Sequence, residues 1–365
     1  MKKSSRANQK YRIKLLLEKY LRRKNRIALN KRKKILVKTK KITNPNIIIP
    51  NDISFATNWE SFVEILNDIQ YTIGHRFIKN RSPLSIDHSL MSKVTPSSIL
   101  VLASTIEKSQ KLAGIKLKGN KSYLPQNETV RYLLNEIDYW KYFNVSKLKT
   151  NFMQNRFTFF KILDSYQVDN TKIGKMIEFF EKQVGFNNDA KSLLNTALCE
   201  ASANTVEHGY NNSNINKDTD RWWLTASIDK QEGTISFVFY DQGMGIFKSL
   251  EHHKNSQVKK LYNRASNLIK DKPHAKILQH MLSNNASKHN TINRGYGMQT
   301  FKNFIDKADN GLLFIASENA SYEYPKDSLK EYSNSLSGTL IVWKIQVNHD
   351  INSNIYLKGD ENDLL

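Results

Sequence analysis

The feature that most constrains the fold is an apolar strand segment that ends in a paired-glycine turn. The β-branched and aromatic run TISFVFY leads directly into Asp241-Gln-Gly243-Met-Gly245, which predicts a buried strand followed by a turn. Glycines at this point let the backbone take a positive φ and approach a ligand closely, because they carry no Cβ. An Asp at the end of such a strand is well placed to accept a hydrogen bond from the exocyclic amine of a base. The same residues would also suit a plain β-turn.

A helix is expected earlier in the chain, in the segment KSLLNTALCEASANTVEHGYNN. Its apolar residues have helical spacing, and Gly209 is a natural stop. Glu200, Asn204 and His208 are four residues apart, so their side chains follow one edge of the helix and turn by only about 40° per step. The Asn carbonyl could coordinate Mg²⁺, and the Glu could polarise an attacking water or hydroxyl. The spacing alone is also typical of a solvated helix face.

Two further motifs follow the strand in the order that a nucleotide site would need. A second glycine pair, Arg294-Gly295-Tyr-Gly297, precedes a segment with helical spacing, QTFKNFIDKA. A glycine loop that opens into a helix presents free N–H groups and the positive end of the helix dipole, which suits phosphate. The tripeptide Ser-Gly-Thr339 then opens the last strand, LIVWKI. Its hydroxyl could hold a base or a bound water, although Ser-Gly is also common turn chemistry.

Taken together, E-x-x-x-N-x-x-x-H, D-x-G-x-G, a long connection, G-x-G-M and S-G-T resemble the GHKL ATPases. This superfamily includes gyrase-type topoisomerases, heat-shock chaperones of that class, histidine kinases and mismatch-repair ATPases. The segment CEASANTVEHGY is most similar to the corresponding part of the anti-sigma-factor serine kinases. The resemblance implies that residues 152–348 form a Bergerat-type ATP-binding domain of the α/β class, a sandwich of helices on a mixed sheet.

The resemblance also implies a role for each matching residue. Glu200 would be the general base and Asn204 the Mg²⁺ ligand, with ATP as the nucleotide. Asp241 would bind the adenine amine with the help of Thr339, and the two glycine pairs would shape the base pocket and hold the phosphates. The residues expected to bind the nucleotide are Asn204, His208, Asp241, Gly243, Gly245, Arg294, Gly295, Gly297 and Thr339.

The connection 247–293 would then be the ATP lid. Long connections of this kind are often functional. This one contains five of the nine histidines, which are His252, His253, His274, His280 and His289. A histidine metal site is the alternative, but apart from the adjacent pair no two of them have tight ligand spacing, so a solvated, basic lid is favoured.

Residues 50–150 are expected to form a separate, small α/β domain. The segment SSILVLASTIEKSQKL predicts a helix that Gly114 closes, followed by a brief strand, IKLKG. The stretch 94–143 resembles the STAS-like domains of anti-sigma-factor antagonists. Ser97 and Ser98 would occupy the helix that carries the regulatory phosphoserine in that family, although serines are also ordinary helix caps. His88 echoes the phospho-accepting box of histidine autokinases, but its surroundings favour another role.

The basic charge is concentrated at the N-terminus. Residues 1–41 contain eighteen Lys or Arg and one acid, and so carry +17 of the formal net charge of +22. Apolar residues at helical spacing between 13 and 21 predict an amphipathic basic helix within an arm, 1–45, that is helical or disordered. Such an arm suits nucleic-acid phosphates, anionic lipid or an acidic protein partner, and packing on its own protein is the alternative. Residues 349–365 form an acidic tail.

Composition narrows the class of protein. The single cysteine, Cys199, excludes an internal disulfide framework and multi-cysteine zinc sites. No run of apolar residues is long enough for a membrane span, which predicts a cytoplasmic protein.

The sequence therefore predicts a Mg²⁺-ATP-binding regulator of the kind found in bacteria, either an ATP-dependent switch or a serine protein kinase similar to anti-sigma factors. The alternatives are a conformational ATPase whose arm binds nucleic acid or a partner protein, and a nucleotide sensor without turnover. The sequence does not decide the reaction or the oligomeric state, for which a dimer is one option.

Overall fold

A computed structural model of the chain describes residues 47–79, 85–117, 119, 123–150, 156–184, 188–210, 216–253, 256, 259–260, 262–263, 266, 269, 271–283, 297–308 and 310–346. The predicted basic arm and acidic tail lie outside these residues, as do Arg294 and Gly295. Of the helices in the described ranges, none combines the length and the apolarity needed to cross a membrane.

A five-stranded sheet organises the described residues between 47 and 346. Its strands, in spatial order, are β3 (Phe157–Ser165), β4 (Trp222–Asp229), β5 (Thr234–Asp241), β7 (Ser328–Gln346) and β6 (Leu312–Tyr324). All four neighbouring pairs are antiparallel. The expected mixed sheet is therefore wrong for these strands. Direct turns join β4 to β5 and β6 to β7. The helical connection from β3 to β4 joins antiparallel neighbours, whereas the one from β5 to β6 joins two strands that run in the same direction on either side of β7.

The predicted strand TISFVFY is β5, and it lies in the interior of the sheet between β4 and β7. Its side chains alternate between two hydrophobic clusters: Phe237 and Phe239 face one cluster, whereas Val238 and Tyr240 face the other. Because successive residues of a strand point to opposite faces, a continuous apolar run indicates burial on both sides. The predicted buried strand is therefore confirmed.

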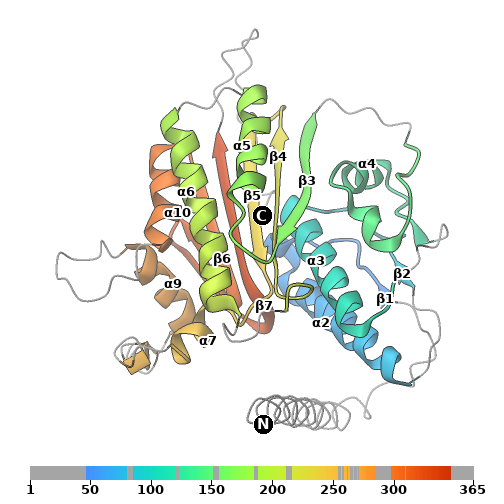
Figure 1. Cartoon of the computed structure of the whole chain (residues 1–365), viewed down its shortest axis with the longest axis horizontal. Helices are drawn as coiled ribbons and strands as arrows, with labels where there is room; N and C mark the ends of the chain where they lie inside the picture. Colours follow the sequence, from blue (N-terminus) through green and yellow to red (C-terminus); the bar gives the residue numbers. More distant parts are fainter. Residues whose placement is uncertain are drawn as a thin grey trace, which may run out of the picture. The chain divides into compact units, whose positions relative to one another are not determined.

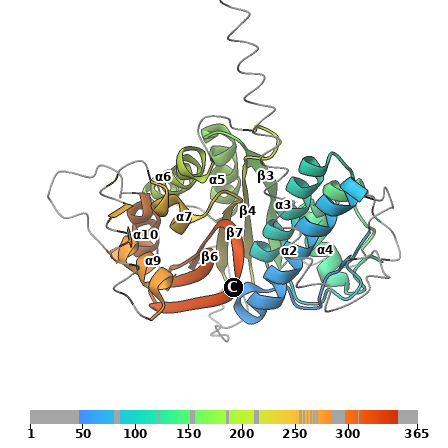
Figure 2. The same ribbon diagram turned by 90° about the horizontal axis from the view of Figure 1, so that it is seen from below.

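One face of the sheet is covered by the helices that belong to the expected ATP-binding region (Figures 1 and 2). They are α5 (Asn170–Val184), α6 (Asn188–Asn204), α7 (Ile246–Glu251), α9 (Pro273–Ser283) and α10 (Gly297–Lys307). Phe180 on α5, Leu198 on α6 and Phe304 on α10 pack with Trp343 of β7 in one cluster. The expected helix around Glu200 is confirmed, and it continues as a π-helical turn, Thr205–Gly209, before it ends.

The opposite face is covered by helices from residues 50–150 (Figure 2). They are α2 (Phe55–Lys79), α3 (Pro96–Ala113) and α4 (Glu128–Glu136), followed by a 3-10 turn at Tyr139–Phe143. Phe62 of α2 and Leu102 of α3 belong to the same core cluster as Trp223 and Tyr240 of the sheet. The described residues between 47 and 346 thus belong to one compact unit, and the helices of the expected small domain share its core.

Residues 50–150 contain less strand than the sequence pattern suggested. The segment 115–117, expected to begin a strand, lies outside any strand, so that prediction is wrong where the chain is described. The strand found in the described part of this region is β2 (Ile86–Asp87), which pairs in parallel with β1 (Ile47–Ile48) just before the region. The predicted helix end is confirmed, since Gly114 caps α3 in the left-handed conformation at φ 64°.

Candidate functional site

A cavity of about 520 Å³ lies beside α6, at the end of β5. Apolar side chains such as Phe239, Met298 and Ile341 form part of its wall. Six residues predicted from the sequence line it, namely Glu200, Asn204, His208, Asp241, Gly245 and Thr339. Pockets of this size, mostly apolar with a few convergent polar groups, are typical of small-molecule sites.

The edge of α6 supplies three of these polar groups. Glu200 and Asn204 are half-buried and lie one turn apart, as their spacing predicts. The helix then widens into the π-helical turn, which carries His208. Insertions of this kind are frequent at functional sites. The His208 ring lies 6.0 Å, centroid to centroid, from His253, just after α7, so this edge meets the beginning of the expected lid.

Asp241 is the buried carboxylate of the cavity. It is the last residue of β5 and pairs in register with Thr339 of β7. Both side chains lie on the α6 face, because residues 239 and 341, two positions away on each strand, pack there. The Asp241 carboxylate accepts hydrogen bonds from the backbone N–H of Gly243 at 2.7 Å and from the Thr205 hydroxyl at 3.5 Å.

The pKa of Asp241 is raised from its ordinary value of 3.8 to about 6. Burial is the largest cause, because it disfavours the charged form. Hydrogen bonds from Gly243, Thr205 and Thr339 and the charge of Lys108 act in the opposite direction. A buried carboxylate with a perturbed pKa in a cleft is a feature of functional sites.

Two glycines of the D-x-G-x-G motif are required by the local geometry. A Cβ on Gly243 would lie 2.5 Å from the carbonyl oxygen of Gly209, at the end of the π-helical turn. Gly245 has φ +85° and begins α7, and a Cβ there would collide with Glu318. The first glycine therefore lets the turn after β5 approach the end of α6, and the second lets the chain enter α7.

Sequence reasoning missed Glu318, which holds α7 in place. This residue lies at an irregularity of β6 with φ 53°. Its Oε2 accepts hydrogen bonds from the backbone N–H groups of Phe247 and Lys248, at 2.9 and 3.1 Å, and its Oε1 is 3.1 Å from the Lys248 ammonium. No local signal could have found it, because its partners are about seventy residues away in the chain.

The phosphate side of the predicted site is described in part. Gly297 begins α10, as expected for a glycine loop that opens into a helix.

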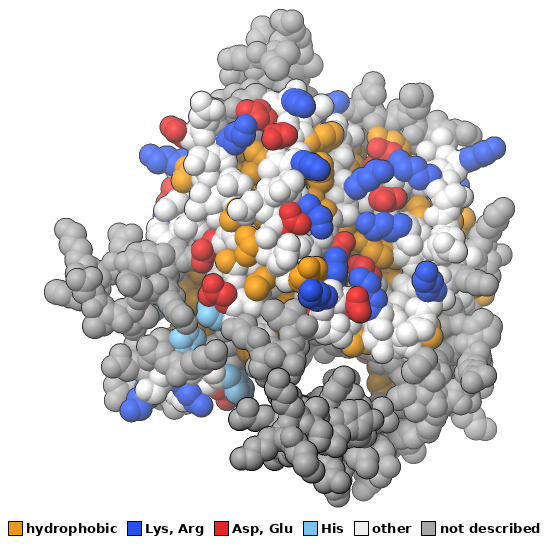
Figure 3. All heavy atoms as spheres, in the orientation of Figure 1, with side chains coloured by type: hydrophobic (Ala, Val, Ile, Leu, Met, Phe, Trp, Pro, Cys, Tyr) orange, Lys and Arg blue, Asp and Glu red, His pale blue; other side chains and the backbone are white. Residues whose placement is uncertain are grey.

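Histidine side chains are visible at the edge of the molecule beside α7 and α9 (Figure 3). His274 hydrogen-bonds to Asn319 at 2.7 Å and stacks on Phe247 at 4.2 Å between ring centroids. Within the described ranges, no group of three or more His, Cys, Asp or Glu is arranged to hold a metal ion.

The possible phosphoacceptors on the other face are buried. Ser98 forms a capping box with Thr95, in which each backbone N–H donates to the other side chain. Ser97 is 5% exposed and its hydroxyl is 2.9 Å from that of Thr95. His88 is also buried, 2.8 Å from the Tyr139 hydroxyl, and burial lowers its pKa to about 4. Their roles in this structure are capping and core packing.

No protein-family model matches the sequence, and no curated protein matches it.

Proposed function

We propose that the chain binds Mg²⁺-ATP in the cavity beside α6 and acts as an ATP-dependent regulatory switch of the GHKL type. The observation that carries this proposal is the shared cavity itself. One end holds a buried acceptor, Asp241, and the α6 edge holds Glu200 and Asn204. A volume of about 520 Å³ falls in the range of pockets that enclose small ligands.

The base would bind at the Asp241 end. An ionised carboxylate only accepts hydrogen bonds, so it suits the exocyclic amine of adenine and disfavours the 6-oxo group of guanine, which is itself an acceptor. Thr339, opposite Asp241 on β7, adds a hydroxyl at the same point. Phe239 and Ile341 supply apolar surface for the ring. These contacts would give a preference for ATP over GTP.

The phosphates would lie toward Glu200 and Asn204. Mg²⁺ prefers six oxygen ligands and usually takes only one or two from protein, with the rest from phosphates and water. The Asn204 side-chain oxygen fits this requirement. When bound, the ion would neutralise phosphate charge, and Glu200 would accept a proton from an attacking water or hydroxyl. The N–H groups at the beginning of α10 would add hydrogen bonds to phosphate oxygens.

The burial of Ser97 and Ser98 favours a switch over autophosphorylation at these residues. Both hydroxyls are engaged at the cap of α3, and neither lies in the lining of the cavity. A serine kinase would then act on a partner protein. In the switch, nucleotide binding would change the position of the lid and thereby the interaction of the chain with a partner, which the basic arm would help to bind.

Radiolabelled ATP tests the proposal and separates its alternatives. The full chain is incubated with Mg²⁺ and γ-labelled ATP, beside Glu200→Gln, Asn204→Ala and a control, Glu178→Gln, on the exposed face of α5. We expect bound ATP in the wild type, the Glu200 variant and the control, and weaker Mg²⁺-dependent binding in the Asn204 variant.

The fate of the label then identifies the reaction. Free phosphate that disappears in Glu200→Gln would indicate an ATPase, label on a partner or on the chain would indicate a kinase, and bound ATP without turnover would indicate a sensor. Absence of ATP binding at millimolar concentration would contradict the proposal in every form.

A further inference from the structure

The residue between Asp241 and Gly243 belongs to the opposite face of the sheet. Gln242 is 5% exposed, and its side-chain amide donates hydrogen bonds to the Thr105 hydroxyl at 3.1 Å and the Ser104 hydroxyl at 3.3 Å, both on α3. The alternation of side chains along a strand explains this arrangement, because it sends residue 242 away from the face that Asp241 occupies. Hydrogen bonds from Gln242 to α3 therefore attach the turn after Asp241 to a helix on the face of the sheet opposite the cavity.

Lys108, on the next turn of α3, completes this attachment. Its Nζ donates a hydrogen bond of 2.7 Å to the backbone carbonyl of Gln242 and lies 5.5 Å from the centroid of the Tyr210 ring. An ammonium that is largely removed from water requires nearby negative charge or hydrogen-bond acceptors. Burial lowers the pKa of Lys108, and the charges of Asp220 and Asp241 act against that effect.

Lys108 is a positively charged group that acts on the Asp241 carboxylate. The ionisable groups that interact with the carboxylate are Lys108 from α3, Tyr240 on its own strand, and Tyr210 after α6. Asp220, before β4, interacts with Lys108 and Tyr210. Among the described residues, Lys108 is the cation whose charge lowers the pKa of Asp241.

We propose that Lys108 is a positioning residue for base recognition: it fixes the backbone of the Asp-Gln-Gly turn and supplies the positive charge that keeps Asp241 in its hydrogen-bond-accepting form. The inference rests on the proposed nucleotide function, but it adds a residue outside the cavity and on the other side of the sheet. It also gives α3 a direct connection to the specificity of the site.

Base selectivity should follow the ionisation of Asp241. The ionised carboxylate accepts from a 6-amino purine, whereas the protonated acid can donate to the 6-oxo group of hypoxanthine. An opposite charge nearby typically shifts a carboxyl pKa downward by about 1–3 units. Loss of the Lys108 charge should therefore extend the protonated form to higher pH and reduce the preference for ATP over ITP there.

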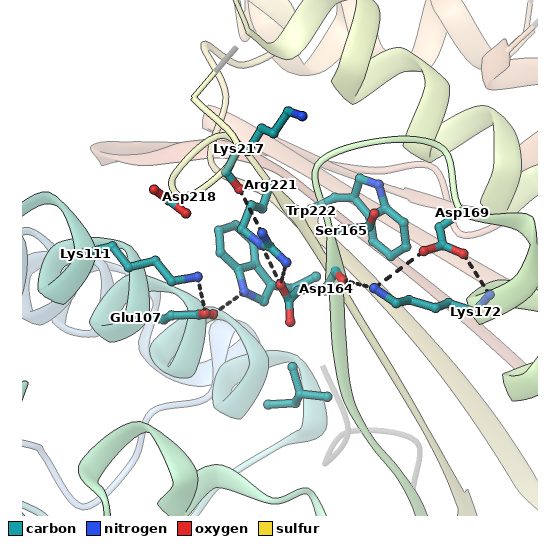
Figure 4. A network of polar contacts seen from close by, with 12 residues as sticks. Glu107, Lys111, Asp164, Ser165, Asp169, Lys172, Lys217, Asp218, Arg221 and Trp222 are labelled. Atoms are coloured by element: carbon teal, nitrogen blue, oxygen red, sulfur yellow. Dashed lines mark hydrogen bonds and ion pairs between the residues drawn. The ribbon is translucent and has the colours of Figure 1, made fainter.

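The test uses three variants of the full chain. Lys108→Gln removes the charge but keeps a hydrogen-bond donor, and Lys108→Arg keeps the charge. Lys111→Gln is the matched control, because Lys111 is one turn further along α3 and pairs with Glu107 at 2.6 Å (Figure 4). Affinities for Mg²⁺-ATP and Mg²⁺-ITP are measured from about pH 5 to about pH 9, the range in which carboxyl and amine groups of perturbed pKa titrate.

We expect ATP affinity of the wild type to decline below about pH 6, with the midpoint shifted upward by about one pH unit in Lys108→Gln. Lys108→Arg and the Lys111 control should retain the wild-type midpoint. An unchanged midpoint in a folded Lys108→Gln variant would overturn the inference. A uniform loss of affinity at every pH would also overturn it, since that result indicates only a structural role.

A second measurement does not depend on nucleotide binding. Carboxyl carbons of ¹³C-labelled aspartate are followed by NMR in the ligand-free protein, and the Asp241 signal is identified by its loss in Asp241→Asn. Its titration midpoint should rise in Lys108→Gln and not in the control. A wild type that binds no ATP but shows this shift would refute the proposed function and leave the Lys108–Asp241 interaction established, whereas an absent shift would refute the interaction.

Discussion

Replacing Asp241 with asparagine should stabilise the ligand-free protein in a pH-dependent way. Asp241 is 6% exposed, and its pKa of about 6 exceeds the ordinary value of 3.8. Between these two values the folded state binds a proton that the unfolded state has released, so wild-type stability falls as the pH rises through this window. At about 1.4 kcal/mol per pH unit, the ionised carboxylate lowers the free energy of unfolding by about 3 kcal/mol above pH 6.

The Asp241→Asn variant lacks this titration. Its advantage over the wild type should be close to zero below about pH 4 and should rise to about 3 kcal/mol near pH 8. Urea denaturation followed by tryptophan fluorescence measures the difference, because Trp222, Trp223 and Trp343 are fully buried in the sheet. Asp218→Asn, at an exposed position, is the control. An Asp241→Asn variant that is less stable than the wild type at pH 8, or whose advantage does not grow with pH, would refute the reasoning.

Three further predictions concern the turns and caps around the site. Gly243→Ala should abolish nucleotide binding, because the new Cβ would lie 2.5 Å from the Gly209 carbonyl oxygen. Gly174→Ala, with open space around it on α5, should keep nucleotide binding and raise the free energy of unfolding by about 0.5–1 kcal/mol. Equal ATP affinities of the two variants in calorimetry would contradict this contrast. Thr95→Ala should lower the free energy of unfolding by about 0.5–2 kcal/mol through loss of the α3 cap, and unchanged urea denaturation would argue against it. Glu318→Gln should weaken nucleotide affinity about two- to fivefold by loosening α7, and an unaltered dissociation constant would show that this cap does not shape the cavity.

The parts of the site that lie on one element could be predicted from the sequence. The helix edge of Glu200 and Asn204 follows from a spacing of four residues, and the position of Asp241 follows from the apolar run before it. Both signals are local, since helix period and strand burial are written in neighbouring residues. The closure of α3 at Gly114 was predicted for the same reason.

The parts that join distant elements could not be predicted. Lys108 and Gln242 are 134 residues apart in the chain. Glu318 is 71 residues from Phe247, whose backbone N–H donates a hydrogen bond to its carboxylate. An apolar helix face indicates that a partner exists but does not identify it, so the packing of 50–150 on the sheet was not foreseen. Strand direction has the same limitation, because it depends on how each connection returns to the sheet.

Calorimetric titration of the full chain with Mg²⁺-ATP and Mg²⁺-GTP near neutral pH tests the central claim most directly. The account predicts that the wild type binds ATP more tightly than GTP, and that Asp241→Asn loses ATP binding while it stays folded. Failure of the wild type to bind ATP at millimolar concentration, or undiminished ATP affinity in a folded Asp241→Asn variant, would contradict it.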